Sequence, residues 1–201
     1  MVMERTYRGI SADERRALRR RQLLDAALDL WGDPGSKVTM TAICQGAHLT
    51  ERYFYESFSN LDQALVAVVD EIAARVQRAT VTALADAGDD PVERVTVVVE
   101  AFVHTMVTDP RVGRAALIEA AGPEVTRPRR ELLLRRLARL AAREARKLNG
   151  PAAWSEDDGP LLATMFVGGI AQAVATSLED GTTQPAEIVE AATHAFRALT
   201  A

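Results

Sequence analysis

The sequence predicts an all-α protein built from about nine helices. Strong helix formers, above all Ala, Leu and Arg, dominate its 201 residues, and aromatic residues make up only 5%. The alternation of β-branched residues that is typical of a strand is nearly absent. The one β-rich run, residues 95–99, lies inside an apolar stretch that continues to Val107, and a stretch of this length favours a buried helix.

The N-terminal part predicts one long helix followed by two short ones. Ser11 and Glu14 have the spacing of a capping box, which predicts the start of a helix that reaches about Trp31. The segment 32–35 contains two glycines and a proline and is expected to end this helix. Thr39 then precedes a short predicted helix over 40–46, residues 47–49 form a tight turn, and Thr50 precedes a helix that ends near Phe58.

Six further helices are predicted in the rest of the chain. The first of them begins at Asn60 or Asp62 and carries an apolar face of leucine, isoleucine and valine side chains. Pro91 and Pro110 suit the first turn of the next two helices, because proline has no N–H to leave unpaired there. The six helices are expected over residues 60–88, 91–108, 110–121, 125–149, 158–178 and 185–201.

Two short helices joined by a tight turn, with a longer supporting helix before them, make a helix-turn-helix. In this motif the second short helix presents its N-terminal residues to base edges in the major groove of DNA. The sequence therefore predicts a DNA-binding domain over residues 1–60 and a larger helical domain over 61–201. Nine apolar residues are expected to hold the second short helix at its angle: Leu24, Ala27, Leu30, Trp31, Ile43, Ala47, Leu49, Phe54 and Phe58.

The charge is distributed unevenly along the chain. The net charge of −4 argues by itself against a nucleic-acid partner, but residues 1–60 carry a slight excess of Lys and Arg while the remainder is acidic. This asymmetry is expected when only the N-terminal domain meets phosphates. The first predicted helix contains Arg15, Arg16, Arg19, Arg20 and Arg21, which either contact phosphates or form a solvated face.

A longer pattern extends over about residues 15–70. Its elements are Leu23, Leu24, Ala26, Ala27, Leu30, Trp31, Gly35, Thr39, Met40, Ile43, Ala47, Leu49, Thr50, Tyr53, Phe54, Tyr55 and Phe58. This pattern resembles the N-terminal signature of the tetracycline-repressor (TetR) family of transcriptional regulators. The C-terminal region resembles that family only in the number and length of its helices.

The resemblance implies that several residues bind DNA. Thr39 and Thr50 would offer hydroxyls and helix N-termini to phosphates, and Tyr55 looks like the family's phosphate-contacting tyrosine. Arg52 and Tyr53 are the candidates for reading base edges, with arginine preferring guanine. Glu51 would accept from cytosine or favour the helix N-terminus electrostatically.

The chain departs from the family pattern at three positions. His48 replaces the usual turn glycine, so a positive φ at this position costs free energy. Ser57 stands where histidine is frequent and is a weaker phosphate partner. Leu61 replaces a frequent lysine and removes one positive charge. These departures lower the expected affinity for DNA without changing the fold.

The resemblance also implies that the C-terminal domain binds a small molecule and forms a dimer. The predicted helix over 91–108 is apolar on nearly every side and is therefore central. Phe102, Met106, Trp154, Met165 and Phe166 are the candidates for lining a ligand pocket, with plain core as the alternative for each. The last two helices are expected to pair with their symmetry mates in a four-helix interface that contains Gly168, Gly169, Ala173, Ile188, Ala192 and Phe196.

Other classes of function have little support in the sequence. The single cysteine, Cys44, leaves no internal disulfide and fits a reducing cytoplasm. No apolar run is expected to be long enough to span a membrane. His48, His104 and His194 lie far apart, so no metal site is predicted. No arrangement of catalytic residues and no glycine-rich phosphate loop stands out, so neither an enzyme nor a cofactor is predicted.

Together these expectations describe a cytoplasmic homodimer whose two recognition helices, about 34 Å apart, meet successive major grooves of a palindromic DNA operator. A small molecule that binds one domain spacing better than another would release the operator, so the predicted function is that of a repressor. The alternative is a DNA-binding regulator whose C-terminal domain only dimerises or binds a protein partner. The arginine-rich helix over 125–149 presents either a solvated face or a second nucleic-acid surface.

Overall fold

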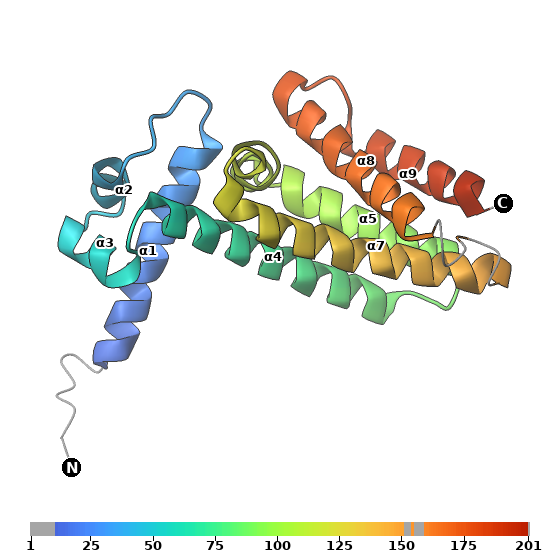
Figure 1. The fold of residues 1–201 in the computed structure, drawn as a ribbon, viewed down its shortest axis with the longest axis horizontal. Coiled ribbons are helices and arrows are strands. Elements are labelled where there is room, and N and C mark those ends of the chain that lie inside the picture. Colours follow the sequence, from blue (N-terminus) through green and yellow to red (C-terminus); the bar gives the residue numbers. More distant parts are fainter. Residues whose placement is uncertain (1–10, 151–153, 155–158, 201) are drawn as a thin grey trace, which may run out of the picture. The chain divides into compact units, whose positions relative to one another are not determined.

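The computed structural model describes residues 11–150, 154 and 159–200, and every regular element among them is helical (Figure 1). The chain divides into two compact units, residues 1–68 and 69–201. The division falls inside helix α4 (Leu61–Asp86), whereas the boundary expected from the sequence lay at the start of that helix. Helix α4 therefore carries the chain from the first unit into the second.

The first unit contains α1 (Ala12–Gly32), α2 (Met40–Gly46) and α3 (Glu51–Ser57), in the predicted order. The predicted capping box is present at the start of α1. The Glu14 backbone N–H donates to the Ser11 hydroxyl at 3.1 Å, and the Ser11 N–H donates to the Glu14 carboxylate at 2.7 Å. These two bonds satisfy N–H groups that a helix start otherwise leaves unpaired, and they fix where α1 begins.

A small apolar core joins these three helices. Leu23, Ala27, Ile43 and Phe54 are fully buried, and the rings of Phe54 and Phe58 pack with centroids 5.4 Å apart. Most of the predicted core is confirmed, but Leu24, Leu30 and Leu49 are only half-buried, and Leu23 and Ala26 are buried instead. The stripe of α1 that faces the core is thus rotated slightly from the one expected.

Helix α4 starts where the sequence predicted. The backbone N–H of Gln63 donates to the Asn60 side chain at 2.9 Å, so Asn60 caps the helix. The predicted apolar face is confirmed, with Leu65, Val68, Val69, Ile72 and Val76 all buried.

The second unit continues with α5 (Pro91–Val107), α6 (Pro110–Gly113), α7 (Arg127–Asn149), α8 (Gly159–Asp180) and α9 (Pro185–Thr200). Helix α5 packs against α7, α8 and α9, and α8 packs against both α7 and α9. Seven residues of α5 are buried, and the β-rich run at 95–99 is helical as predicted. Figure 1 shows α5, α7, α8 and α9 as neighbouring helices of one bundle.

The prediction of one regular α-helix over 110–121 is wrong. Only Pro110–Gly113 is α-helical; a π-helical turn follows at η1 (Arg114–Ile118) and a 3₁₀ turn at η2 (Glu119–Ala121). A further 3₁₀ turn, η3 (Glu124–Thr126), leads into α7. The hydroxyl of buried Thr126 donates to the carbonyl groups of Ala120 at 2.7 Å and Pro123 at 2.8 Å, which closes this irregular corner.

Helix α8 extends two residues beyond its predicted end and is strongly apolar. It has 22 residues and a mean hydropathy of 1.6 over its most apolar 18-residue window, so by length and composition it could cross a membrane, contrary to the expectation. A core helix passes the same test, and α8 buries Phe166, Val167 and Val174 against its own bundle. About a third of the window is buried, which leaves apolar surface, including Leu161 and Met165, exposed.

Candidate nucleic-acid interface

The turn between α2 and α3 is a Schellman motif with histidine in the glycine position. The N–H of Leu49 donates to the carbonyl of Cys44 at 2.9 Å, and the N–H of His48 donates to the carbonyl of Gln45 at 3.1 Å. His48 has φ 54°, in the left-handed region, where a non-glycine residue costs free energy, as expected from its place in the family pattern. The four residues from Ala47 to Thr50 therefore form a tightly bonded turn that sets the direction in which α3 starts.

The two threonines that precede the short helices differ in what their hydroxyls do. The Thr39 hydroxyl accepts from the Ala42 N–H at 3.1 Å and caps α2. Thr50 occupies the corresponding position before α3, but its side chain makes no capping bond. The start of α3 is held to α2 in another way, because the hydroxyl of Thr41 donates to the Glu51 carboxylate at 3.1 Å.

Arg52 and Tyr55, two of the predicted DNA contacts, are both exposed on α3. The Arg52 side chain is 84% exposed and donates to Glu56 one turn further along α3, at 3.2 Å. Tyr55 is 59% exposed, and its ring meets that of buried Phe54 edge-on with centroids 5.9 Å apart. The Arg52 and Tyr55 side chains thus project into solvent from α3, and the buried aromatic ring of Phe54 supports Tyr55 from below.

Tyr53 is held between two helices instead of standing free. The guanidinium of Arg19 on α1 lies 4.4 Å from the centre of the Tyr53 ring, a cation–π distance. Arg19 also pairs with Glu56 at 3.6 Å. Ser57, at the end of α3, is half-buried. The Arg52 side chain is thus more accessible than that of Tyr53, which is half-buried.

Three residues have roles in this site that were not predicted: Thr41 and Arg19 hold α3 to the other two helices, and Glu56 of α3 pairs with Arg19 and Arg52. Their roles depend on which side chains the fold brings together, and no spacing rule pairs Arg19 with Glu56, which is far from it in the sequence. Cys44 on α2 is buried as well. Burial raises the pKa of the Cys44 thiol, and the nearby charge of Glu51 adds to this rise.

In the second unit, the predicted pocket residues separate into three groups. Phe102 and Phe166 line a cavity of about 30 Å³ between α5, α7 and α8. Met106 and Trp154 are buried but do not line this cavity. The Trp154 ring packs against that of Phe166 with centroids 6.2 Å apart, and its indole N–H donates to the Leu199 carbonyl at 2.9 Å. The prediction that Met165 lines a pocket is wrong, because it is 64% exposed while its neighbour Phe166 faces inwards.

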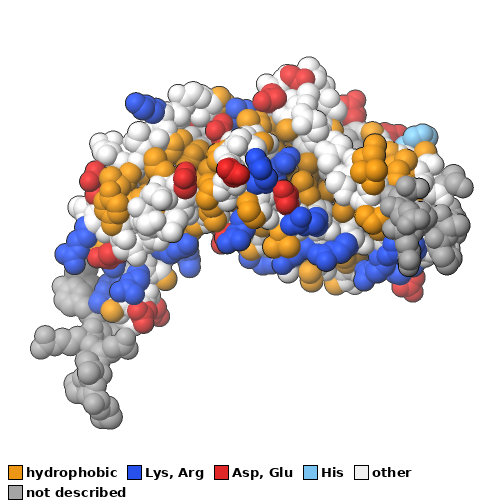
Figure 2. Space-filling model, in the orientation of Figure 1, with side chains coloured by type: hydrophobic (Ala, Val, Ile, Leu, Met, Phe, Trp, Pro, Cys, Tyr) orange, Lys and Arg blue, Asp and Glu red, His pale blue; other side chains and the backbone are white. Residues whose placement is uncertain are grey.

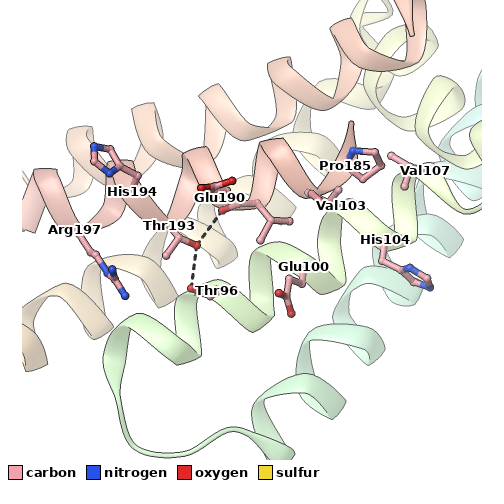
Figure 3. A pocket seen from close by; sticks show the side chains of 12 residues that line it. Thr96, Glu100, Val103, His104, Val107, Pro185, Glu190, Thr193, His194 and Arg197 are labelled. Carbon is pink, nitrogen blue, oxygen red and sulfur yellow. Dashed lines mark hydrogen bonds between the residues drawn. The ribbon is translucent and has the colours of Figure 1, made fainter. Parts of the chain in front are cut away.

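A wider groove that the sequence did not predict lies between α5 and α9 (Figure 3). It has a volume of about 700 Å³, and the Thr96 and Thr193 hydroxyls, 3.0 Å apart, join the two helices within it. Glu100, His104 and Glu190 stand exposed along it. A ligand in this groove would remain largely in contact with water.

The residues predicted to form a dimer interface also divide. Ile188, Ala192 and Phe196 are buried within their own chain, so the prediction that this face of α9 meets a partner is wrong. An amphipathic pattern shows that a helix has a covered face, but it does not distinguish a covering helix of the same chain from one of a second copy. On α8, Gly169 is exposed, and a Cβ added at Gly168 or Gly169 would meet nothing within 4 Å.

The arginine-rich face of α7 is partly occupied by ion pairs. Arg129 pairs with Asp70 at 2.9 Å and Arg135 with Glu131 at 3.1 Å, while the Arg136 guanidinium donates to Gln77 at 3.0 Å. Figure 2 shows a row of Lys and Arg side chains over this part of the molecule. Two of these cations, Arg129 and Arg136, join α7 to α4, which favours a solvated, structural face over a second nucleic-acid surface.

Solved structures with the same fold are numerous. A TetR-like transcriptional regulator from Rhodococcus sp. RHA1 is 22% identical, with 90% of this chain and 94% of that chain covered and a TM-score of 0.74. The fatty acid degradation regulator FadR from Bacillus halodurans is 15% identical, with coverage of 90% and 94% and a TM-score of 0.73.

FadR from Bacillus subtilis, solved in complex with stearoyl-CoA, is 14% identical, with coverage of 90% and 97% and a TM-score of 0.71. No family model and no curated protein matches the sequence. At these identities the likeness establishes the fold, which extends over both units, and the all-α prediction is confirmed along most of the chain.

Proposed function

We propose that this chain, which has the fold of TetR-like transcriptional regulators, is a sequence-specific DNA-binding regulator of transcription. The observation that carries the proposal is the helix-turn-helix of the first unit, in which α3 exposes Arg52 and Tyr55 on a braced core. Arg52 reads a guanine in the major groove, and Tyr55 donates its hydroxyl to a phosphate. Thr39 and Thr50 bring the starts of α2 and α3 to the phosphates on either side.

The regulator acts as a homodimer in the cytoplasm. Its interface is the exposed face of α8, where Leu161 and Met165 leave apolar surface in solvent and Gly168 and Gly169 allow a second helix to approach closely. A twofold axis through this face makes the interface self-complementary, so the two α3 helices meet the two halves of a palindrome.

A small molecule bound in the second unit controls the affinity for DNA, and its binding releases the operator. The cavity between α5, α7 and α8 is the proposed site, because its walls are in the bundle interior and include Phe102 and Phe166. The stearoyl-CoA bound by B. subtilis FadR supports ligand sensing for this fold. A ligand that binds one conformation better than another shifts the population by its difference in affinity.

The proposed DNA binding is tested by selecting binding sites from random duplex DNA with the full chain. We expect an enriched palindrome whose half-sites lie about 10 base pairs apart, or a multiple of that spacing. The expected specific affinity is at least about 10³-fold above that for unselected duplex at the same salt concentration. Failure to enrich any sequence, with the protein folded, would contradict the proposal.

A further inference from the structure

Among the residues that the structure describes, only apolar side chains line the cavity between α5, α7 and α8. Val95 and Phe102 come from α5, Leu140 and Ala141 from α7, and Phe166 from α8. A void of about 30 Å³ whose described walls are apolar does not hold water well, because a buried water needs two or more hydrogen-bond partners. The chemistry of this cavity therefore selects hydrocarbon.

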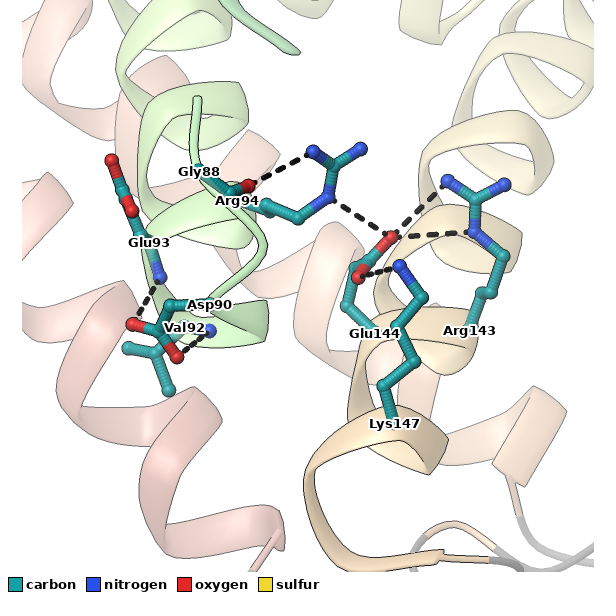
Figure 4. A network of polar contacts seen from close by, with 8 residues as sticks. All are labelled: Gly88, Asp90, Val92, Glu93, Arg94, Arg143, Glu144 and Lys147. Carbon is teal, nitrogen blue, oxygen red and sulfur yellow. Dashed lines mark hydrogen bonds and ion pairs between the residues drawn. The ribbon is translucent and has the colours of Figure 1, made fainter. Parts of the chain in front are cut away.

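A cluster of charged side chains, shown in Figure 4, neighbours two walls of the cavity in the sequence of α5 and α7. Glu144 follows Ala141 by three residues and Leu140 by four, so it stands one turn further along the same face of α7. It is fully buried and pairs with Arg94 at 3.5 Å, Arg143 at 3.1 Å and Lys147 at 2.9 Å. Arg94 directly precedes Val95 of the cavity wall and also donates to the Gly88 carbonyl at 3.2 Å.

The cluster carries an excess of positive charge. One carboxylate faces three cations, and the other carboxylates in Figure 4 do not restore the balance. Asp90 caps α5 by accepting from the N–H groups of Val92 and Glu93, and the Glu93 side chain points away from the cluster. The Arg143 and Lys147 side chains remain 57% and 48% exposed, so they have N–H groups available for a second anion.

We infer that the cavity and the cluster together bind one amphipathic anion: a hydrocarbon chain with a carboxylate or phosphate head. This inference names the ligand class for the regulator proposed above and rests on that proposal. The chain occupies the apolar cavity, and the head pairs with Arg143 and Lys147, while buried Glu144 holds both cations in place. Small-molecule sites typically measure about 300–1,000 Å³, so the chain must widen the cavity. The half-buried side chains of Leu137 and Leu140 are the ones that move.

The test is calorimetric titration of the full chain, without DNA, with decanoate and decanoyl-CoA below their micelle concentrations and with the uncharged decan-1-ol below its solubility limit. Decanoate or decanoyl-CoA should bind more tightly than decanol, and the tighter of the two identifies the head. Shortening the acid to octanoate removes two methylenes and should weaken binding by about tenfold. Equal affinity for decanol and both anions would overturn the assignment of the head to the cluster.

Variants separate the head from the chain. Lys147→Gln should weaken the anion about two- to fivefold and leave decanol unchanged. Arg139→Gln, the same charge change at an exposed position of α7 outside the cluster, is the matched control and should change neither. Equal effects of the two variants on the anion would overturn the proposal. Ala141→Leu should fill the cavity and weaken all three ligands, with melting temperature as the check on its folding.

Absence of any saturable binding by the wild-type protein would overturn this inference. Selection of an operator uses no ligand, so the proposed DNA binding would stand or fall on that separate measurement.

Discussion

His48 occupies a backbone conformation that costs a non-glycine residue free energy. A left-handed φ costs about 1–2 kcal/mol, and glycine would remove that cost while losing about 0.5–1 kcal/mol through its more flexible unfolded state. Because His48 is exposed, no packing is lost with its side chain. His48→Gly should therefore raise the free energy of unfolding by about 0.5–1 kcal/mol in urea denaturation. His48→Ala keeps the strained φ and should show no such gain; equal gains in both variants would contradict the turn geometry.

Glu144 links stability to pH. Burial raises the pKa of its carboxyl, but hydrogen bonds and charges from Lys147 and Arg143 outweigh burial, and the net pKa lies below the usual 4.5. A lowered folded-state pKa means that the folded state holds the ionised form, so this stabilisation is full above about pH 4.5 and is lost as the pH falls through the folded-state pKa.

The free energy of unfolding should accordingly fall more steeply below pH 4.5 for the wild type than for Glu144→Gln. Other carboxyls with lowered pKa, such as Asp109, titrate in both proteins and cancel in the comparison. Parallel pH profiles for the two proteins would show that the Glu144 carboxyl is not held in its ionised form.

Elements that begin or end at a strong local signal were the ones the sequence predicted well. Ser11 and Asn60 cap α1 and α4, Pro91 lies in the first turn of α5, and the spacing of Phe54 and Phe58 identified α3. The irregular corner at 114–126 was missed, because hydrophobic spacing does not distinguish α, π and 3₁₀ turns over so few residues. Its geometry depends on how closely α6 approaches its neighbours.

Gly113 makes that close approach possible. A Cβ at this position would lie 2.5 Å from the carbonyl oxygen of Met106 and would also collide with the Leu178 side chain. Gly113→Ala should therefore lower the free energy of unfolding by about 1–3 kcal/mol, since a backbone carbonyl cannot move aside cheaply. Gly122→Ala, where nothing lies within 4 Å of the added carbon, is the control and should be nearly neutral in thermal denaturation. A neutral Gly113→Ala would show that α6 is packed less tightly than described.

Some of the contacts predicted in the second unit are wrong for a different reason. Met165 and Phe166 are adjacent, equally apolar residues, yet one is exposed and the other lines a cavity. Ile188 and Phe196 form a clear apolar stripe, but their own chain covers it. Which helix covers which stripe is a property of the whole bundle, and no local pattern in α8 or α9 encodes it.

At the scale of the whole molecule, the exposed face of α8 predicts self-association. Met165→Glu places a charge on that face and should shift the species from the mass of two 21.8-kDa chains to that of one in light scattering. Val81→Glu makes the same change at a similarly exposed position of α4 and should leave the dimer intact. A dimer that survives Met165→Glu would place the interface on another face.

The central claim is that the intact protein reads DNA through α3. Substitutions of two exposed side chains distinguish contacts that read a base from contacts that only bind the phosphate backbone. Tyr55→Phe removes a phosphate donor and should weaken binding to every duplex by a similar factor. Arg52→Ala should cost about 1–3 kcal/mol on the selected operator and relax discrimination at one base pair of each half-site.

The most direct measurement is therefore the affinity of the wild type and Arg52→Ala for the selected operator and its single-base variants, at one fixed salt concentration. The account predicts that the wild type discriminates at the base pair read by Arg52 and that the variant does not. A uniform loss across all duplexes would assign Arg52 to the phosphates. Unchanged affinity in both Arg52→Ala and Tyr55→Phe would contradict the claim that α3 is the recognition helix.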